Sequence, residues 1–226
     1  MPDSVETSPA YAAAVADLLG MLAYAELAAC ARLAADSDLA PTVSARVALA
    51  RMAGAELAHH DLLAARIVEL GADPEEVMAP YAEAFAAFHD RTRPSTWLEA
   101  VVKAYVGDGI AEDFGREIAA FADPRSREVI EGSLSDEARN AVLVDLARAG
   151  MTADPQAVGR LALWGRRLHG EAISSAQAAA AERDGLTALL TGQFGGDGLD
   201  LARLGELFAR LATRHTDRMA ALGLDA

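Results

Sequence analysis

A glutamate and a histidine lie within the apolar stripe of one long predicted helix, and this pattern constrains the fold more than any other in the chain. The segment Glu56-Leu57-Ala58-His59 places a carboxylate and an imidazole one helical turn apart on the same face. The residues stacked above and below Glu56 on that face are apolar, namely Leu49, Met52, Ala53, Leu63 and Ile67. Because an unpaired charge in a protein core is very costly, either the core compensates these two side chains or the helix turns them toward water.

The composition predicts an almost wholly helical protein. Hydrophobic residues make up 52% of the 226 residues and aromatic residues only 5%, and Ala, Leu, Glu and Arg dominate while β-branched residues are sparse. A chain of this length can bury a substantial core. We therefore expect an all-α fold in a single domain over residues 1–226, with a core bundle over about 9–150 and accessory helices over about 154–222.

Helix start and stop signals divide the chain. Ser8, Asp73, Asp123 and Asp154 each precede a proline, as an N-cap residue before the first helical position does, and Gly71 is placed as a C-terminal cap. The expected helices cover residues 9–35, 41–70, 74–89 with a break at Pro80, 97–122, 124–150, 155–183, 186–190 and 199–222.

Charge and motif content exclude several classes of function. The net charge of −14 argues against a broad nucleic-acid footprint, which needs a basic surface. The single cysteine, Cys30, excludes an internal disulfide and fits a reducing cytoplasm. The first ten residues contain no basic region, so we expect no signal peptide, and no apolar run of the length that spans a bilayer is expected. A glycine-rich phosphate loop, a cysteine pair for zinc and a nucleophile beside a base are also missing from the sequence.

A second buried acid accompanies the Glu-x-x-His motif. Glu26 is the single charge on the apolar stripe of the helix expected over residues 9–35. A glutamate from one helix with Glu56 and His59 from the next is half of the ligand set of a di-metal four-helix bundle. Two simpler explanations are open, because the Glu26 stem could reach solvent or Arg32 could pair with it.

The second half of the chain repeats this arrangement in altered form. Glu137-Ala138-Arg139-Asn140 lies in the helix expected over residues 124–150, and Asp108 precedes Glu137 by nearly the interval that separates Glu26 from Glu56. The two halves read Glu…Glu-x-x-His and Asp…Glu-x-x-Asn. Such near-equal intervals on core-facing positions favour an inherited metal site over coincidence.

These motifs resemble those of a known family. Asp-Glu-Ala-Arg-Asn at 136–140 is similar to the Glu-Ala-Arg-His motif of the di-iron hydroxylases that act on a modified tRNA adenosine, and residues 55–59 resemble the first Glu-x-x-His of that family. The resemblance covers about residues 10–148. It implies a ferritin-like antiparallel four-helix bundle with additional C-terminal helices, an iron cofactor and an oxygen-dependent hydroxylase or oxidase reaction.

The resemblance also implies a ligand set. Glu26, Glu56 and His59 would bind one metal; Asp108, Glu137 and Asn140 would lie at the other, with Glu56 and Glu137 bridging. Asn140 offers a neutral oxygen where histidine would give a stronger nitrogen donor, and Asp108 is one methylene shorter than glutamate. Glu112, one turn after Asp108, could substitute for it, and His169 and Glu171 are further candidates. The implied partners are a modified tRNA or small-molecule substrate and a redox partner.

Alternative interpretations remain open at this point. The site could hold two metals, one metal or none; in the last case its acids would have raised pKa values or would pair with Arg139 or another cation. The corresponding protein would be a non-catalytic ferritin-like scaffold, expected as a homodimer, and iron storage is a third possibility. No catalytic residue is assigned.

Two further features of the sequence need a reason. Gly107 and Gly109 flank Asp108 inside a predicted helix, where each glycine costs about 1 kcal/mol relative to alanine. They indicate either a π-bulge that re-aims Asp108 or close helix packing. Trp164-Gly165-Arg166-Arg167 is either a partner or tRNA contact or an ordinary solvated face, and His60 is expected to point away from His59.

Overall fold

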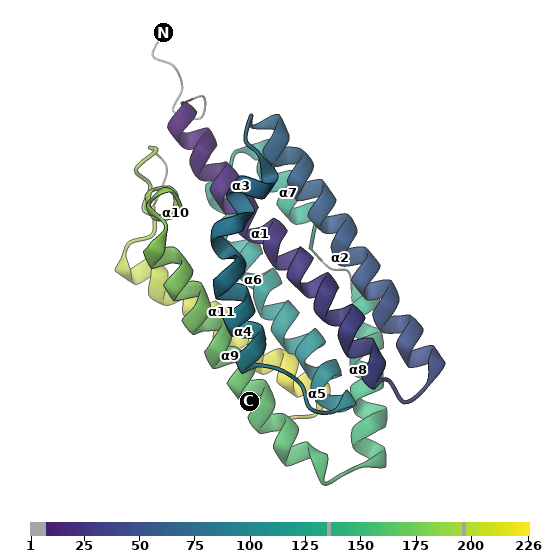
Figure 1. Ribbon diagram of the computed structural model, residues 1–226. Coiled ribbons are helices and arrows are strands. Elements are labelled where there is room, and N and C mark those ends of the chain that lie inside the picture. Colours follow the sequence, from purple (N-terminus) through teal and green to yellow (C-terminus); the bar gives the residue numbers. More distant parts are fainter. Residues whose placement is uncertain (1–7, 135–136, 196–197) are drawn as a thin grey trace.

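The computed structural model describes residues 8–134, 137–195 and 198–226; the side chains of residues 137–138 and 179–181 lie outside this description. All regular elements in the described residues are helices. The first half of the core is a pair of long helices, α1 (Pro9–Asp36) and α2 (Val43–Glu69), which pack antiparallel along their length and are joined through the short 3-10 helix η2 (Ser37–Leu39) (Figure 1).

The second half of the core is built from shorter pieces. Its first helical segment consists of α5 (Trp97–Val102), the π-helix η4 (Lys103–Gly107), α6 (Asp108–Ile118) and the 3-10 helix η5 (Ala119–Phe121). Its second helical segment consists of α7 (Pro124–Gly132) and α8 (Glu137–Ala153), and both helices contact α2. The expected all-α bundle is therefore confirmed.

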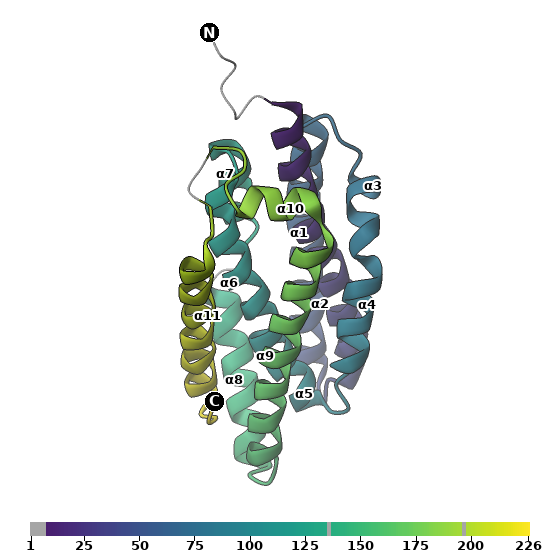
Figure 2. The same cartoon turned by 90° about the vertical axis from the view of Figure 1, so that its left-hand side faces the viewer.

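The remaining helices cover this core from outside. They are α3 (Pro74–Met78), η3 (Ala79–Tyr81), α4 (Ala82–Arg91), α9 (Ala157–Glu182), α10 (Asp184–Leu190) and α11 (Leu201–Leu222). Figure 2 shows α4 and α11 on opposite sides of the molecule, with α9 between them. Helix α9 packs on α4 and on the π-helix, while α11 packs on α6 and α8.

Local capping explains where the long helices begin and end. The Ser8 side chain accepts a hydrogen bond from the Tyr11 amide at 3.1 Å, and Thr42 caps α2 through the Ala45 amide at 3.2 Å. Gly71 follows α2 with a φ of 82°, a left-handed conformation that favours glycine. These caps define the start of α1 and both ends of α2.

One expected helix is wrong. The chain over 124–150 does not form one helix, because α7 ends at Gly132 and α8 begins at Glu137. The Ser133 hydroxyl donates to the Ile130 carbonyl at 2.8 Å, and glycine at 132 is a weak helix former. Gly132 and Ser133, both weaker helix formers than alanine, therefore stand where the helix ends.

Both explanations offered for the glycines beside Asp108 hold. The π-helix ends at Gly107, immediately before Asp108, so the expected opened turn is confirmed. Gly109 is needed for a different reason, since a side chain there would collide with the guanidinium of Arg218 on α11. The close approach of α11 thus accounts for Gly109, whereas Gly107 has a helical φ of −69° and room for a side-chain carbon.

Helix α1 is the most apolar element of the bundle. Among the described residues, one helical segment, Pro9–Leu39, is long and apolar enough to cross a membrane by length and composition alone, with a mean hydropathy of 1.5. On that criterion the expectation that no stretch reaches this length is wrong. Half of the same window is buried inside the bundle, and packing against α2 accounts for its apolar surface.

Helix α11 is held to the core by ion pairs as well as by apolar packing. Asp113 on α6 is buried, and its Oδ2 lies 2.6 Å from Nη2 of Arg218 on α11. Arg116 and Arg214 also approach Asp113, at 2.9 and 3.6 Å. The side chain of Arg218 is only 15% exposed, so this pair is shielded from water.

We predict that Asp113→Asn lowers the free energy of unfolding by about 3 kcal/mol, because it leaves buried Arg218 without its counter-charge. Arg116→Gln removes a partner that is 45% exposed and should change the free energy by less than about 1 kcal/mol. Urea denaturation of the two variants and the parent chain measures both effects. Equal stability of the two variants would contradict this role for Asp113.

Candidate metal centre

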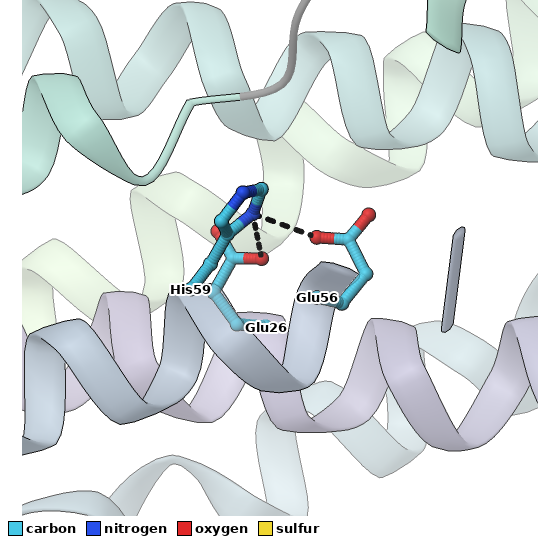
Figure 3. Close-up of side chains that lie close together, drawn as sticks. All are labelled: Glu26, Glu56 and His59. Carbon is cyan, nitrogen blue, oxygen red and sulfur yellow. Dashed lines mark ion pairs between the residues drawn. The ribbon is translucent and has the colours of Figure 1, made fainter. Parts of the chain in front are cut away.

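Three of the residues proposed as metal ligands lie together between α1 and α2. Glu26 comes from α1, and Glu56 and His59 come from α2 one turn apart (Figure 3). His59 Nδ1 lies 3.4 Å from Glu56 Oε2 and 3.7 Å from Glu26 Oε2. One ligand atom from each residue lies within 4.8 Å of the others. The apolar stripe of α2 therefore does carry its Glu and His into the interior.

The three side chains differ in their access to water. Glu56 is almost fully buried, at 3% exposed, whereas the side chains of Glu26 and His59 each retain 18% exposure. His60, the next residue, points away from the cluster and contacts the Ala23 carbonyl at 3.0 Å through Nδ1. Glu26 and His59 are thus the more exposed members of the cluster, and Glu56 is the most buried one.

Burial and mutual contact shift the pKa values of the cluster in different directions. Burial, with the neighbouring Glu56 carboxylate, raises the pKa of Glu26 to about 9. Burial would also raise the pKa of Glu56, but His59, Glu26 and Arg139 together lower it to about 2. The carboxylates of Glu26 and Glu56 raise the pKa of His59 to about 9. At neutral pH, Glu26 and His59 therefore hold protons while Glu56 is ionised.

The geometry of this cluster fits one metal ion. Two carboxylate oxygens and one imidazole nitrogen are donors for divalent transition metals. With metal–ligand bonds of about 2.1 Å, neighbouring donors of a tetrahedral site lie about 3.4 Å apart, close to the two distances at His59. Both distances are longer than an ordinary hydrogen bond, and the buried His59 Nδ1 makes no hydrogen bond within the described chain. An ion bound there would satisfy that nitrogen.

Asp108, from the other half of the expected ligand set, contacts an arginine that also contacts Glu56 and Glu112. The guanidinium of Arg139, from α8, has Nη1 at 2.7 Å from Glu56 Oε1 and Nη2 at 3.0 Å from Asp108 Oδ2. Nη1 also lies 3.4 Å from Glu112 Oε1. The Arg139 side chain is only 9% exposed. A fixed positive charge therefore lies among the carboxylates that a second metal would need.

Asp108 has a second arginine partner. Its Oδ1 accepts from Arg32 Nη2 at 2.7 Å, and Arg32 Nη1 also pairs with Asp36 at 3.3 Å. Burial raises the pKa of Asp108, and the guanidinium groups of Arg32 and Arg139 oppose part of that rise. Both Asp108 oxygens are engaged by guanidinium groups. The side chains that the structure describes here, Asp108, Arg32 and Arg139, thus do not fit a second metal at this position.

The remaining candidates lie elsewhere. Asn140 is half-buried on α8, and the side chain of Glu137 lies outside the described residues. His169 stacks on His215 with ring centroids 4.3 Å apart, and Glu171 pairs with Arg91 at 2.6 Å. Neither His169 nor Glu171 belongs to the Glu26–Glu56–His59 cluster.

The sequence did not identify all the carboxylates with which Arg32 and Arg139 pair. Arg32 was open as a partner of Glu26, but it pairs with Asp36 and Asp108 instead. Arg139 was open as a counter-charge to the buried acids, and it does hold that position. The signal for Arg139 was its place between two proposed ligand positions of the motif, Glu137 and Asn140. Nothing in local spacing links Arg32 to Asp108.

Comparison with known proteins supports the fold. The family model described as "Ferritin-like domain, actinomycetes" matches residues 9–193. No curated protein matches the chain. The match spans the bundle, α9 and α10, and therefore includes every residue of the Glu26–Glu56–His59 cluster and of the arginine network around Asp108.

We predict that Arg139→Met lowers the free energy of unfolding by about 3–5 kcal/mol, because Asp108, Glu112 and Glu56 then lose a buried counter-charge. Arg46→Met is the matched control, since Arg46 pairs with Asp38 on the surface and is 53% exposed. That change should cost less than about 1 kcal/mol. Chemical denaturation of both variants without added metal measures the difference, and a loss of equal size in both would refute the structural role of Arg139.

Proposed function

This chain belongs to the ferritin-like domain family of actinomycetes, and from that premise we propose that it binds one divalent transition-metal ion through Glu26, Glu56 and His59. In this proposal Arg139 replaces the second metal of a di-metal bundle. The protein is then a single-metal member of a fold that elsewhere holds two metals.

The contact between Arg139 and two carboxylates supports this proposal most strongly. The guanidinium lies 2.7 Å from Glu56 and 3.0 Å from Asp108, so a positive charge attached to α8 is already present between them. A divalent ion in the same place would meet strong repulsion at low dielectric. Two irons bridged by Glu56 are therefore disfavoured, whereas one ion on the His59 side is compatible with Arg139.

Each residue of the cluster has a separate task in this account. Glu56 presents Oε2 toward His59 while Arg139 holds Oε1, so the carboxylate is fixed in one orientation. Glu26 and His59 supply the other two donors and face the accessible side of the cluster. A metal held by three protein ligands keeps coordination positions open and acts there as a Lewis acid or redox centre. Iron is the metal that the motif resemblance implies.

A di-iron hydroxylase acting on a modified tRNA adenosine is the second candidate. The Asp-Glu-Ala-Arg-Asn motif at 136–140 favours it. The net charge of −14 argues against a broad tRNA surface, and Trp164 in the only compact basic-aromatic segment is buried and donates to the Glu99 carbonyl. A metal-free scaffold is the remaining alternative, and a homodimer, a redox partner and a cytoplasmic location remain predictions.

Metal stoichiometry separates these candidates. We predict that the purified protein, loaded with ferrous or manganous ion and desalted, retains one ion per chain and that His59→Ala loses it. His60→Ala is the matched control because His60 contacts the Ala23 carbonyl rather than the cluster, and it should retain the ion. Elemental analysis gives the result. Two ions per chain would support the di-iron candidate, and none in the parent protein would support the scaffold.

The affinity for the ion should rise with pH. Glu26 and His59 both have pKa values raised to about 9 in the metal-free protein, so each must lose a proton before it can bind a cation. Below that value the affinity should increase about tenfold per pH unit for each proton released, and it should level off above it. Chelator competition at several pH values measures the slope. A flat profile across neutral pH would show that these groups are not the ligands.

A further inference from the structure

A small apolar pocket lies between the core and its accessory helices. It has a volume of about 120 Å³ and is lined by residues of α1, η3, α4, α6, α9 and α11, with one from the end of the π-helix. Four aromatic residues contribute to its wall, namely Tyr81, Phe85, Phe88 and Phe114. Small residues leave the space between them, and these are Ala25, Ala84, Gly107, Ala111, Ala172 and Ala176.

The polar groups of the lining are already engaged. The Tyr81 hydroxyl donates to Asp17 Oδ1 at 3.0 Å. Ser175 Oγ accepts from Arg91 at 3.3 Å. Every other lining side chain is apolar, or is glycine. A polar ligand entering the pocket would lose its hydrogen bonds to water without finding replacements, and this excludes sugars, nucleotides and free ions.

We propose that this pocket binds one ring-sized apolar group. Apolar cavities of about 150 Å³ accept benzene, and the volume here is of that order. Edges and faces of four aromatic residues suit a ring or a short alkyl segment. The group is either a free small molecule or the end of a longer apolar chain, since the same wall recognises both.

This site is separate from the metal cluster and does not depend on it. Ala25 and Ala111 are sequence neighbours of Glu26 and Glu112, but neither acid belongs to the pocket lining. The pocket is formed instead by the packing of α4 and α9 against the outer side of α1 and α6. Removal of the metal with a chelator should therefore leave ligand binding unchanged.

Titration calorimetry with toluene tests the proposal on the full-length protein. We expect saturable binding with one site per chain. Ala84→Phe places a ring in the pocket from α4 and should weaken binding by tenfold or more. Ala86→Phe is the matched control, because Ala86 is exposed on the same helix and outside the pocket lining, and it should bind as the parent protein does.

A second variant that fills the pocket from another helix separates loss of the binding site from a failure to fold. Ala176→Phe fills the pocket from α9, and circular dichroism melting identifies any variant that fails to fold. Absence of saturable toluene binding by the parent protein, or equal binding by Ala84→Phe, Ala176→Phe and Ala86→Phe, would overturn the proposal. Tighter binding of 1-decanol than of toluene would assign the pocket to a chain end, and the reverse order to a free ring.

Discussion

The guanidinium of Arg139 is the contact on which the interior of this bundle depends. Carboxylates from α2 and α6 converge on it, with Glu56 and Asp108 at hydrogen-bonding distance and Glu112 slightly farther away. Each of these acids would be costly if buried alone. A di-metal bundle resolves the same conflict with two bound cations. Here the counter-charge on one side belongs to the chain itself, so that side can form without any metal. The helices that meet there, α2, α6 and α8, are consequently fixed by ion pairs whose partners cannot dissociate from the protein.

Glu56 connects this permanent network to the cluster that faces water. One of its oxygens is held by Arg139, and the other points toward His59. On that second side Glu26 and His59 lie against each other and against Glu56, and the pKa values of Glu26 and His59 are raised to about 9. Protons therefore compensate the charge in the absence of an ion. The two oxygens of Glu56 thus differ in their counter-charge. Oε1 is paired with Arg139, which is part of the chain, whereas Oε2 faces protons or a metal ion, which can exchange with solvent. That asymmetry is the physical basis for expecting a single metal.

The fold and the Glu26–Glu56–His59 cluster could be predicted from the sequence, because both follow from helical periodicity and the spacing of residues along the chain. Helix periodicity and spacing place Glu26, Glu56 and His59 on facing stripes, and the structure brings these three residues together. The glycines around Asp108 correctly indicated an opened turn. The break between α7 and α8 was missed, because Gly132 and Ser133 are weaker signals of a helix end than a proline would be. The sequence suggested Arg139 as a counter-charge to the buried acids only as one of several alternatives. An arginine side chain is long and flexible, so spacing fixes its Cα but not the carboxylates that its charged end reaches.

The central claim is that one cation binds beside His59 and that an arginine takes the place of the other. Anomalous diffraction from crystals soaked in manganous ion tests it most directly, because the peaks locate each bound ion relative to the side chains. The account predicts one peak within bonding distance of Glu26, Glu56 and His59, with the Arg139 guanidinium still in contact with Asp108. Two peaks about 3.5–4 Å apart, with Arg139 displaced from Glu56, would contradict it.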